Sequence, residues 1–534
     1  MKKLLIIIFL ILLNNVLNAQ SIDEANQALY NEKYKSAENI YHAIIKQDPS
    51  NAFAWYGLTK SYLLQGKELQ SVDSLKTPGM TSPDHPYTKI AAGIIAMQSG
   101  NMAAAEDLFH QAIKETKEKD AGVLAAVAEA HILLKNGNSN YAIELLNKAI
   151  KRDKRNAVLH VLMGDAYRNM HNGSEAYKAY KLALEKNSNY APAHFKIGEI
   201  FLTQKNSELY LQHFNNAINS DPSYAPALYQ LYVYEFFHNP SRAMEYYNRY
   251  VANADASLRN DYDLADLLYL NKQFDQAIEK ANTIIASQGA DAQPRLYKLL
   301  GYSYAEKKDS SQAMKFMEEY FAKAPDSIVI AKDFETMSAL HQHSGNDSLA
   351  FVFLAKATGV EKDSAALFSY YKKLSNLSKQ QKNYTEQAKW LALYYTNNEK
   401  ANNVDLYNWG LANYLGGNYA QADSVFGLYV EKYPEQSFVY YWQAKSKALL
   451  DKDLVTGIAV PAYIKLTEVL NSNPSDPNYK KWMVESYGYL AAYEANNQKD
   501  YTEAVDYFEK VLEVDPQNED AAKYIAILEK EAEK

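Results

Sequence analysis

Few residue patterns in this sequence could carry catalytic or metal-binding chemistry. His341 and His343 are the closest histidine pair, and two residues apart on a helix they point about 200° away from each other, which disfavours a shared metal ion. Gly66-Lys67 lacks both the earlier glycine and the following Ser or Thr of a phosphate-binding loop. Neither a Gly-x-Ser-x-Gly nor a His-Glu-x-x-His motif occurs. We therefore expect no enzymatic activity, no catalytic residue, no cofactor and no bound metal.

Composition narrows the class of protein further. The chain has 534 residues, of which 47 % are hydrophobic and 22 % are charged, as is usual for a folded protein. The net charge of −8 weighs against non-specific nucleic-acid binding, which needs a basic surface. Cysteine is absent, which excludes disulfides, Cys-ligated zinc, thiol catalysis and the lipidated cysteine of a bacterial lipoprotein.

The N-terminus has the pattern of a secretory signal peptide over residues 1–19. Met1-Lys2-Lys3 is followed by an apolar run from Leu4 to Leu13, and Ala19 supplies the small residue before the expected cleavage site. The apolar run is too short to span a bilayer, and no later stretch reaches the length that a transmembrane helix requires. We expect an exported bacterial protein that is periplasmic or associated with the outer membrane, without a transmembrane span after cleavage.

An internal repeat determines the predicted fold. Ala130, Gly164 and Gly198 are separated by 34 residues each, and Leu146, Tyr180 and Phe214 follow at the same interval. The same unit recurs elsewhere as a glycine, an alanine twelve residues later and a large apolar residue four beyond that. It is found at Gly93/Ala105/Phe109, Gly164/Ala176/Tyr180, Gly301/Ala313/Met317 and Gly410/Ala422/Phe426. Small residues let two antiparallel helices approach closely, and the large residue fills the adjacent space.

This pattern resembles the tetratricopeptide repeat, a helix-turn-helix unit of 34 residues. The chain also resembles secreted bacterial tetratricopeptide repeat proteins, most of which have no assigned function. The resemblance implies an all-α, right-handed solenoid of helical hairpins, with about 13–14 irregular repeats and a C-terminal capping helix. We expect the solenoid over residues 20–450, with a proline-containing loop insertion over residues 67–88, and divergent repeats with the capping helix over residues 451–534.

In this family the first helix of each unit lines a concave groove that binds peptides or extended segments. The resemblance therefore implies a partner-binding groove in the fifth to ninth units. Tyrosine, with 45 residues, is abundant, and Tyr and Arg are common anchors of interfaces. The groove residues predicted in this way are Arg168, Phe195, Tyr229, Phe236, Phe237, Arg259, Tyr262, Tyr269, Arg295 and Tyr302.

Three functions are compatible with such an array. The first is a non-enzymatic scaffold or adaptor of the cell envelope that binds a protein or peptide partner in its groove. The second is a subunit of an outer-membrane assembly or secretion machine. The third is an accessory glycan-binding protein, because aromatic grooves also stack sugars. The sequence does not identify the partner.

Overall fold

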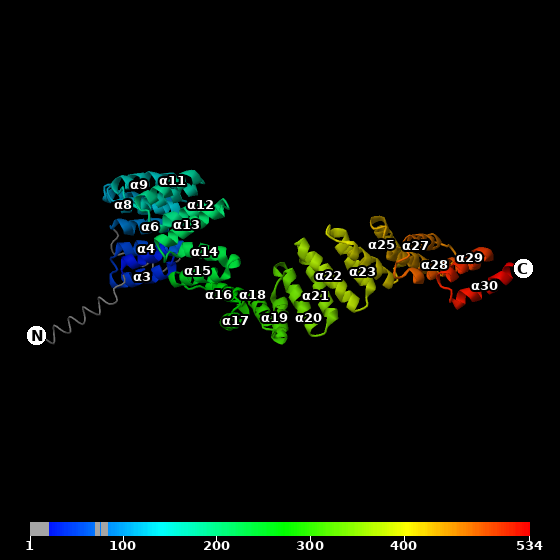
Figure 1. Cartoon of the computed structure of the whole chain (residues 1–534). Coiled ribbons are helices and arrows are strands. Elements are labelled where there is room, and N and C mark those ends of the chain that lie inside the picture. Colours follow the sequence, from blue (N-terminus) through cyan, green and yellow to red (C-terminus); the bar gives the residue numbers. More distant parts are fainter. Residues whose placement is uncertain (1–20, 70–74, 76–83, 534) are drawn as a thin grey trace. The chain divides into compact units, whose positions relative to one another are not determined.

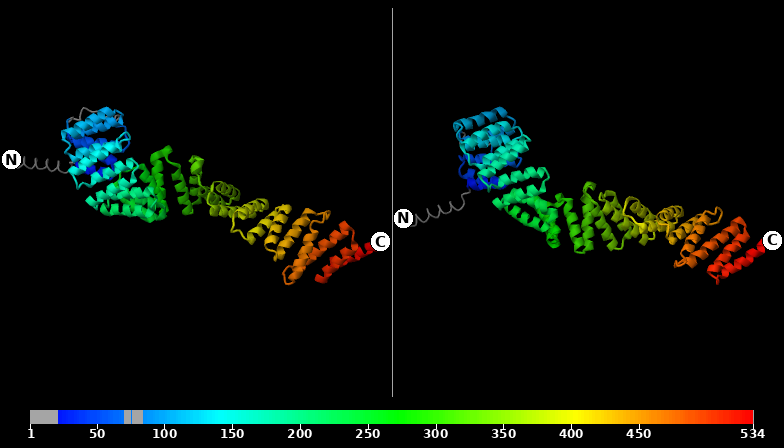
Figure 2. Two further views of the ribbon diagram at one scale, coloured as in Figure 1. Left: turned by 90° about the horizontal axis from the view of Figure 1, so that it is seen from above. Right: turned by 45° about the horizontal axis from the view of Figure 1, so that its top comes forward.

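The computed structural model describes residues 21–69, 75 and 84–533, which form 28 α-helices and no β-strand. Consecutive helices form thirteen antiparallel hairpins, and α4 and α30 are the two further helices (Figures 1 and 2). The predicted all-α solenoid of about 13–14 hairpin repeats is confirmed. The predicted signal peptide and residues 70–74 and 76–83 of the predicted loop insertion lie outside the described residues.

The chain divides into two compact units, Met1–Gly289 and Ala290–Lys534, at a position that lies inside the predicted 20–450 solenoid. The helices of the first unit are α2 (Ile22–Tyr30), α3 (Tyr34–Gln47), α4 (Ala52–Leu64), α6 (Pro86–Gln98), α7 (Met102–Glu115), α8 (Ala121–Leu133), α9 (Ser139–Arg152), α10 (Ala157–Asn169), α11 (Gly173–Lys186), α12 (Ala191–Thr203), α13 (Ser207–Ser220), α14 (Ala225–His238), α15 (Pro240–Asn253), α16 (Leu258–Leu270) and α17 (Phe274–Gln288).

The second unit continues the series of hairpins. Its helices are α18 (Pro294–Glu306), α19 (Ser310–Lys323), α20 (Ala331–His343), α21 (Asp347–Val360), α22 (Ser364–Gln380), α23 (Tyr384–Asn397), α24 (Asn403–Leu415), α25 (Tyr419–Lys432), α26 (Ser437–Leu450), α27 (Val460–Ser472), α28 (Tyr479–Tyr493), α29 (Tyr501–Val514) and α30 (Glu519–Ala532).

A recurring turn joins the two helices of most hairpins. The residue before the second helix's N-cap has a left-handed backbone, as at His171 (φ 57°) and Lys205 (φ 56°). The N-cap that follows is usually Asn, and the Asn172 and Asn206 side chains accept hydrogen bonds from the third backbone N–H of their helices. These caps satisfy amide groups that a helix N-terminus otherwise leaves open, so they define where each second helix begins.

The glycines of the repeat allow the paired helices to approach closely. A Cβ atom added at Gly164 would lie 2.2 Å from the Tyr180 ring, and one added at Gly198 would lie 2.5 Å from the Phe214 ring. Gly410 and Phe426 are related in the same way at 2.5 Å. The predicted packing role of the repeat glycines and of the large residues facing them is confirmed. No residue larger than glycine fits at the glycine positions without displacing the ring.

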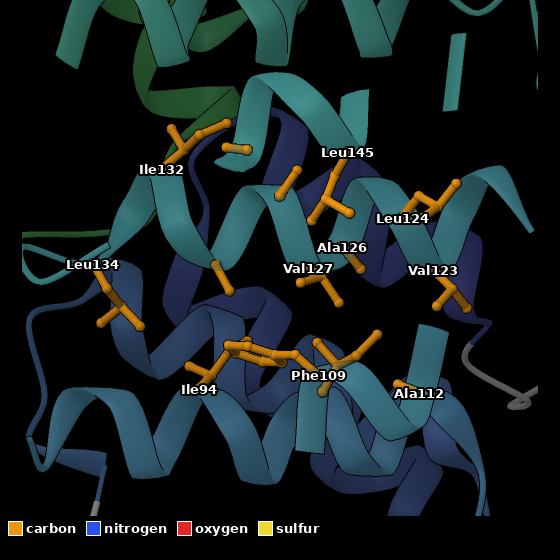
Figure 3. Packing of buried hydrophobic residues seen from close by; sticks show 14 of the residues in the cluster. Ile94, Phe109, Ala112, Val123, Leu124, Ala126, Val127, Ile132, Leu134 and Leu145 are labelled. Carbon is orange, nitrogen blue, oxygen red and sulfur yellow. The ribbon is translucent and has the colours of Figure 1, made fainter. Parts of the chain in front are cut away.

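One buried apolar cluster extends through the hairpins from α2 to α11. Figure 3 shows Phe109 of α7 lying between Ile94 of α6 and Val127 of α8. Phe109 is 1 % exposed, and Ile94 and Val127 are also buried. Each hairpin thus buries its apolar side chains against its own partner helix and against the next hairpin, as a solenoid requires.

The first compact unit also brings its N-terminal hairpin into contact with the hairpin of α14 and α15. Figure 1 shows α3 and α4 beside α14 and α15. The contact joins residues far apart in sequence, because the Lys35 backbone N–H donates to Asp255 at 2.8 Å, and Tyr30 packs on Tyr224 with ring centroids 5.1 Å apart. The array of the first unit therefore turns back on itself.

Hydrogen bonds to Asp451 order the connection between α26 and α27. The Asp451 carboxylate accepts hydrogen bonds from the backbone N–H groups of Val455, Thr456 and Gly457 at 2.9, 3.0 and 2.6 Å. The last helix, α30, packs Tyr524 on Phe508 of α29 with ring centroids 5.4 Å apart. The predicted boundary at residue 451 stays a prediction.

Candidate interaction surfaces

We number the residues of the first helix of each hairpin from that helix's N-cap. Position five carries Phe195, Tyr229 and Tyr262, position nine carries Asp165 and Glu199, and position twelve carries Arg168, Phe236 and Tyr269. Of the ten residues predicted for the groove, eight belong to the first compact unit, and Arg295 and Tyr302 belong to the second. The ten predicted residues therefore do not belong to a single compact unit.

Two of the predicted anchors are core residues, which corrects the sequence prediction. Phe195 is 5 % exposed and Tyr262 is 3 % exposed. The Phe195 ring packs against Phe214 and Tyr224 with centroid distances of 5.6 and 5.7 Å. Tyr262 occupies the same position of its hairpin as Phe195. In the described structure, neither side chain is accessible to a partner.

The predicted arginines already have partners within the chain. Arg168 Nη1 lies 2.5 Å from Glu199 Oε2, and burial alone would lower the pKa of Arg168, but Glu199 outweighs it and raises the pKa. The exposed Arg259 donates to the half-buried Tyr229 hydroxyl at 2.5 Å and lies over the Tyr229 ring. An ion pair between either arginine and a partner therefore has to replace an existing contact.

A ladder of polar side chains runs along the first helices of the first unit. The Glu129 carboxylate accepts a hydrogen bond from the Tyr56 hydroxyl at 2.8 Å and pairs with Lys60 at 2.6 Å. Lys196 lies 3.3 Å from Glu199 and 3.7 Å from Asp165. Burial raises the pKa of Asp165 despite the nearby Lys196, so the surroundings of this ladder are poorly solvated.

The contact that turns the first unit back on itself lies at the N-terminal ends of the first helices. We call Tyr30, Asn31, Ser36, Tyr224 and Asp255 the closure contact. Asp255 accepts hydrogen bonds from the Lys35 and Ser36 backbone N–H groups at 2.8 and 3.2 Å and from the Ser36 hydroxyl at 2.6 Å. Asn31 Oδ1 accepts a hydrogen bond from the Ala225 N–H at 3.3 Å. The closure contact covers Tyr224, which is 4 % exposed, and through it Phe195.

The C-terminal ends of the same first helices carry a row of mostly apolar, partly exposed side chains. We call this the rim row, and it comprises Arg168, Leu202, Phe236, Phe237 and Tyr269 at positions twelve and thirteen. Phe237 is 81 % exposed, which is the highest value among the exposed large hydrophobic side chains of the described residues. It contacts Phe236 edge-to-face with centroids 4.8 Å apart, and Val233, one turn earlier on α14, is 43 % exposed.

In the second unit, the predicted groove residue Tyr302 takes part in a buried polar cluster. Its hydroxyl donates to Asp333 Oδ1 at 2.5 Å, and Asp333 is 0 % exposed. The Tyr320 hydroxyl and the Ile330 N–H each donate to Asp333 Oδ2 at 2.9 Å, and Lys298 pairs with Oδ1 at 3.3 Å. The contacts of Tyr302 are thus those of a structural residue. Arg295 is half-buried on the same helix.

The second unit also has a hollowed surface along α22 that was not predicted. Three neighbouring cavities of about 320, 600 and 210 Å³ all include Asn376 in their walls. Lys372 and Lys373 line them, and these lysines pair with Asp405 at 3.3 Å and Glu335 at 2.5 Å. Among the described residues we find no group of His, Cys, Asp and Glu arranged to hold a metal ion, and no helix long and apolar enough to cross a membrane.

Comparison with known protein families identifies the repeat. A tetratricopeptide repeat-like domain model matches residues 37–200, and two further tetratricopeptide repeat models match residues 299–327, 406–435 and 489–518. The chain contains tetratricopeptide repeats. The repeats are suggestive of a scaffold for protein–protein interaction, because arrays of this kind present extended concave surfaces to other proteins.

Individual relatives of this chain are distant. It is 26 % identical over 155 residues to anaphase-promoting complex subunit 3 of Schizosaccharomyces pombe, and the match spans 29 % of the chain and 23 % of that protein. The C-terminal part of a repeat protein from Cytophaga hutchinsonii is 26 % identical, with coverage of 49 % of this chain and 98 % of that one and a TM-score of 0.30. A repeat protein from Parabacteroides merdae is 14 % identical, with coverage of 55 % and 98 % and a TM-score of 0.23.

Proposed function

We propose that this protein is a non-enzymatic scaffold of the bacterial cell envelope that binds a segment of another protein along the rim row. Tetratricopeptide arrays are generally scaffolds without enzymatic activity, which agrees with the lack of catalytic motifs in the sequence. The signal-peptide pattern of residues 1–19 supports a location in the periplasm or at the outer membrane.

The exposure of Phe237 is the observation that carries this proposal. A phenylalanine that is 81 % exposed, beside the half-buried Phe236 and the 43 % exposed Val233, loses favourable burial unless another molecule covers it. Aromatic side chains at such positions are frequent anchors of protein interfaces. The partner is therefore a protein segment with apolar side chains that pack on Phe236 and Phe237.

The test is co-purification from the envelope fraction of the producing bacterium with matched variants. Phe237→Ser removes the exposed ring from the rim row. Leu182→Ser is the control, because Leu182 is also an exposed apolar residue, at 40 %, but lies on α11, the second helix of its hairpin. We expect a stoichiometric partner to be retained by the wild type and by Leu182→Ser, and to bind roughly thirtyfold more weakly to Phe237→Ser.

The composition of the purified complex separates the three functions that the sequence leaves open. One stoichiometric partner agrees with a scaffold or adaptor. Several co-purifying outer-membrane proteins would assign the chain to an assembly or secretion machine, and retained polysaccharide without protein would indicate glycan binding. Unchanged retention of the partner by Phe237→Ser would refute the proposed role of the rim row.

A further inference from the structure

The closure contact has the composition of a bound peptide rather than that of a hydrophobic core. The turn from Tyr30 to Ser36 lies against the segment before α14 and the segment before α16. Tyr30 packs its ring on Tyr224, and burial together with the nearby Asp221 carboxylate raises the pKa of Tyr30. This turn is thus held at an aromatic platform and by hydrogen bonds to backbone groups.

A charged residue, Glu32, follows Tyr30 in the turn. Glu32, two residues after Tyr30, is exposed, and its pKa is raised, because desolvation and the Glu199 carboxylate raise it more than Lys196 lowers it. Lys196, which lowers this pKa, pairs with Asp165 and Glu199. The surface that the turn covers therefore offers a ring to an aromatic side chain and an ammonium group to a carboxylate.

The hydrogen bonds of the closure contact are exchangeable. Asp255 accepts from the second and third backbone N–H groups of α3, and Asn31 accepts from the first N–H of α14. Neither helix has a side-chain cap from its own N-cap residue, which is Lys33 for α3 and Tyr224 for α14. Water satisfies such N–H groups when a cap leaves, so separating the two segments leaves no buried donor without a partner.

We propose that the turn Tyr30–Ser36 is an internal ligand of the surface formed by Tyr224, Phe195 and Lys196, and that a partner segment with an aromatic residue and a carboxylate two positions later displaces it. Such a segment reproduces the ring contact of Tyr30 and the favourable electrostatic interaction of Glu32 with Lys196. This surface is distinct from the rim row, so it gives the scaffold a second binding site that is closed until a partner opens it.

The first test uses a labelled synthetic peptide of residues 27–36 as the probe, because this peptide carries the chemistry of the internal ligand. Asp255→Ala removes the cap that holds the turn, and we expect this variant of the full chain to bind the peptide at least tenfold more tightly than the wild type. A peptide with Ala at Tyr30 and Gln at Glu32 should bind at least tenfold more weakly than the parent peptide. Absence of peptide binding to Asp255→Ala would overturn the proposal.

A second variant closes the surface covalently. The chain has no cysteine, so the double variant Ser36→Cys/Asp255→Cys contains one reactive pair that a short bismaleimide joins. The cross-linked protein should not bind the peptide, whereas the same protein without cross-linker should bind it as Asp255→Ala does. Equal binding by the two forms would overturn the proposal, and this comparison remains informative if Asp255→Ala does not fold.

A combination of two substitutions distinguishes this second site from the rim row. Phe237→Ser introduced together with Asp255→Ala should leave peptide binding unchanged, because Phe237 lies at the opposite end of its helix from Tyr224. Loss of peptide binding in the combined variant would place the peptide on the rim row and refute a second site. Asp309→Ala, which removes the N-cap of α19 in the second unit, should leave the turn closed and bind no peptide.

Discussion

The carboxylate of Asp255 caps helix α3 through Ser36, which lies 219 residues earlier in the chain. Both the backbone N–H and the hydroxyl of Ser36 donate to Asp255 Oδ1, at 3.2 and 2.6 Å. Asn31 returns the interaction by accepting from the first N–H of α14. Two helices that lack caps of their own thus receive them from opposite ends of the first compact unit.

Replacing Asp255 should destabilise the N-terminal hairpin selectively. We expect Asp255→Ala to lower the free energy of unfolding of the first unit by about 1–2 kcal/mol, because an N-cap contributes this amount. Hydrogen exchange should show loss of protection at the Lys35 and Ser36 amides. Asp309→Ala, whose cap in the second unit is local, should leave these two amides protected. Equal protection in both variants would show that Asp255 does not hold the turn.

Replacing a repeat glycine by alanine should destabilise the array where the facing aromatic ring is unable to move. We expect Gly164→Ala to cost about 2 kcal/mol, because its Cβ would lie 2.2 Å from the Tyr180 ring, whose hydroxyl is fixed by Asp165 at 2.7 Å. Gly173→Ala is the control, since no atom lies within 4 Å of its added Cβ, and we expect it to be neutral or to stabilise by about 0.5 kcal/mol. Urea unfolding of both variants measures the difference.

A substitution at Tyr302 can distinguish a structural role from a partner-binding role. Tyr302→Phe removes one of the donors to the buried Asp333 carboxylate, and we expect a loss of about 2 kcal/mol in the unfolding free energy of the second unit. Tyr304→Phe should change stability by less than about 0.5 kcal/mol, because the Tyr304 ring stacks on Phe316 and its ring is retained. If Tyr302→Phe instead unfolds like the wild type and weakens partner binding, the predicted groove role is correct.

Acid should destabilise the first unit through His213. Burial, followed by His194 and Lys181, lowers the pKa of His213 to about 4, whereas the pKa of histidine in an unfolded chain is about 6.5. Between these values the unfolded chain binds more protons, so the stabilisation is fully present above about pH 6.5 and is lost as the pH falls toward 4.

The ring of His213 is partly exposed, so we expect the loss between pH 7 and pH 4.5 to be about 1 kcal/mol. The free energy of unfolding measured across this range should depend less on pH in His213→Gln than in the wild type. His343→Gln is the control, because His343 is exposed on α20 of the second unit. An identical pH dependence in His213→Gln and the wild type would contradict the prediction.

The repeat was predictable from the sequence because its packing is local. Gly198 and Phe214 lie 16 residues apart in the chain and meet within one hairpin, so their spacing carries the structural information directly. The alignment through Ala130 was less successful. Gly164 follows its N-cap Asn156 by eight residues, but Ala130 follows Asp120 by ten, so Ala128 takes the equivalent place in α8. A longer connection before α9 restores the register.

That shift explains why the candidate site was only partly predicted. With Ala130 in the glycine column, Glu129 falls on a buried position, whereas its true place is position nine, where it meets Tyr56 and Lys60. Asp120, a good N-cap residue, was the signal that could have located it. The chain of ring contacts from Phe195 to Tyr224 and from Tyr224 to Tyr30 was not predictable from a repeat, because no local pattern connects Tyr30 with Tyr224.

The closure contact has a consequence for how the first unit folds. A linear repeat array has only short-range contacts, so it folds from any hairpin and frays readily from its end. Pairing Ser36 with Asp255 adds a contact across 219 residues, and such a contact forms only after the hairpins between them are in place. The terminal hairpin is therefore the last to dock during folding, and once docked it converts an open-ended array into a cooperative unit.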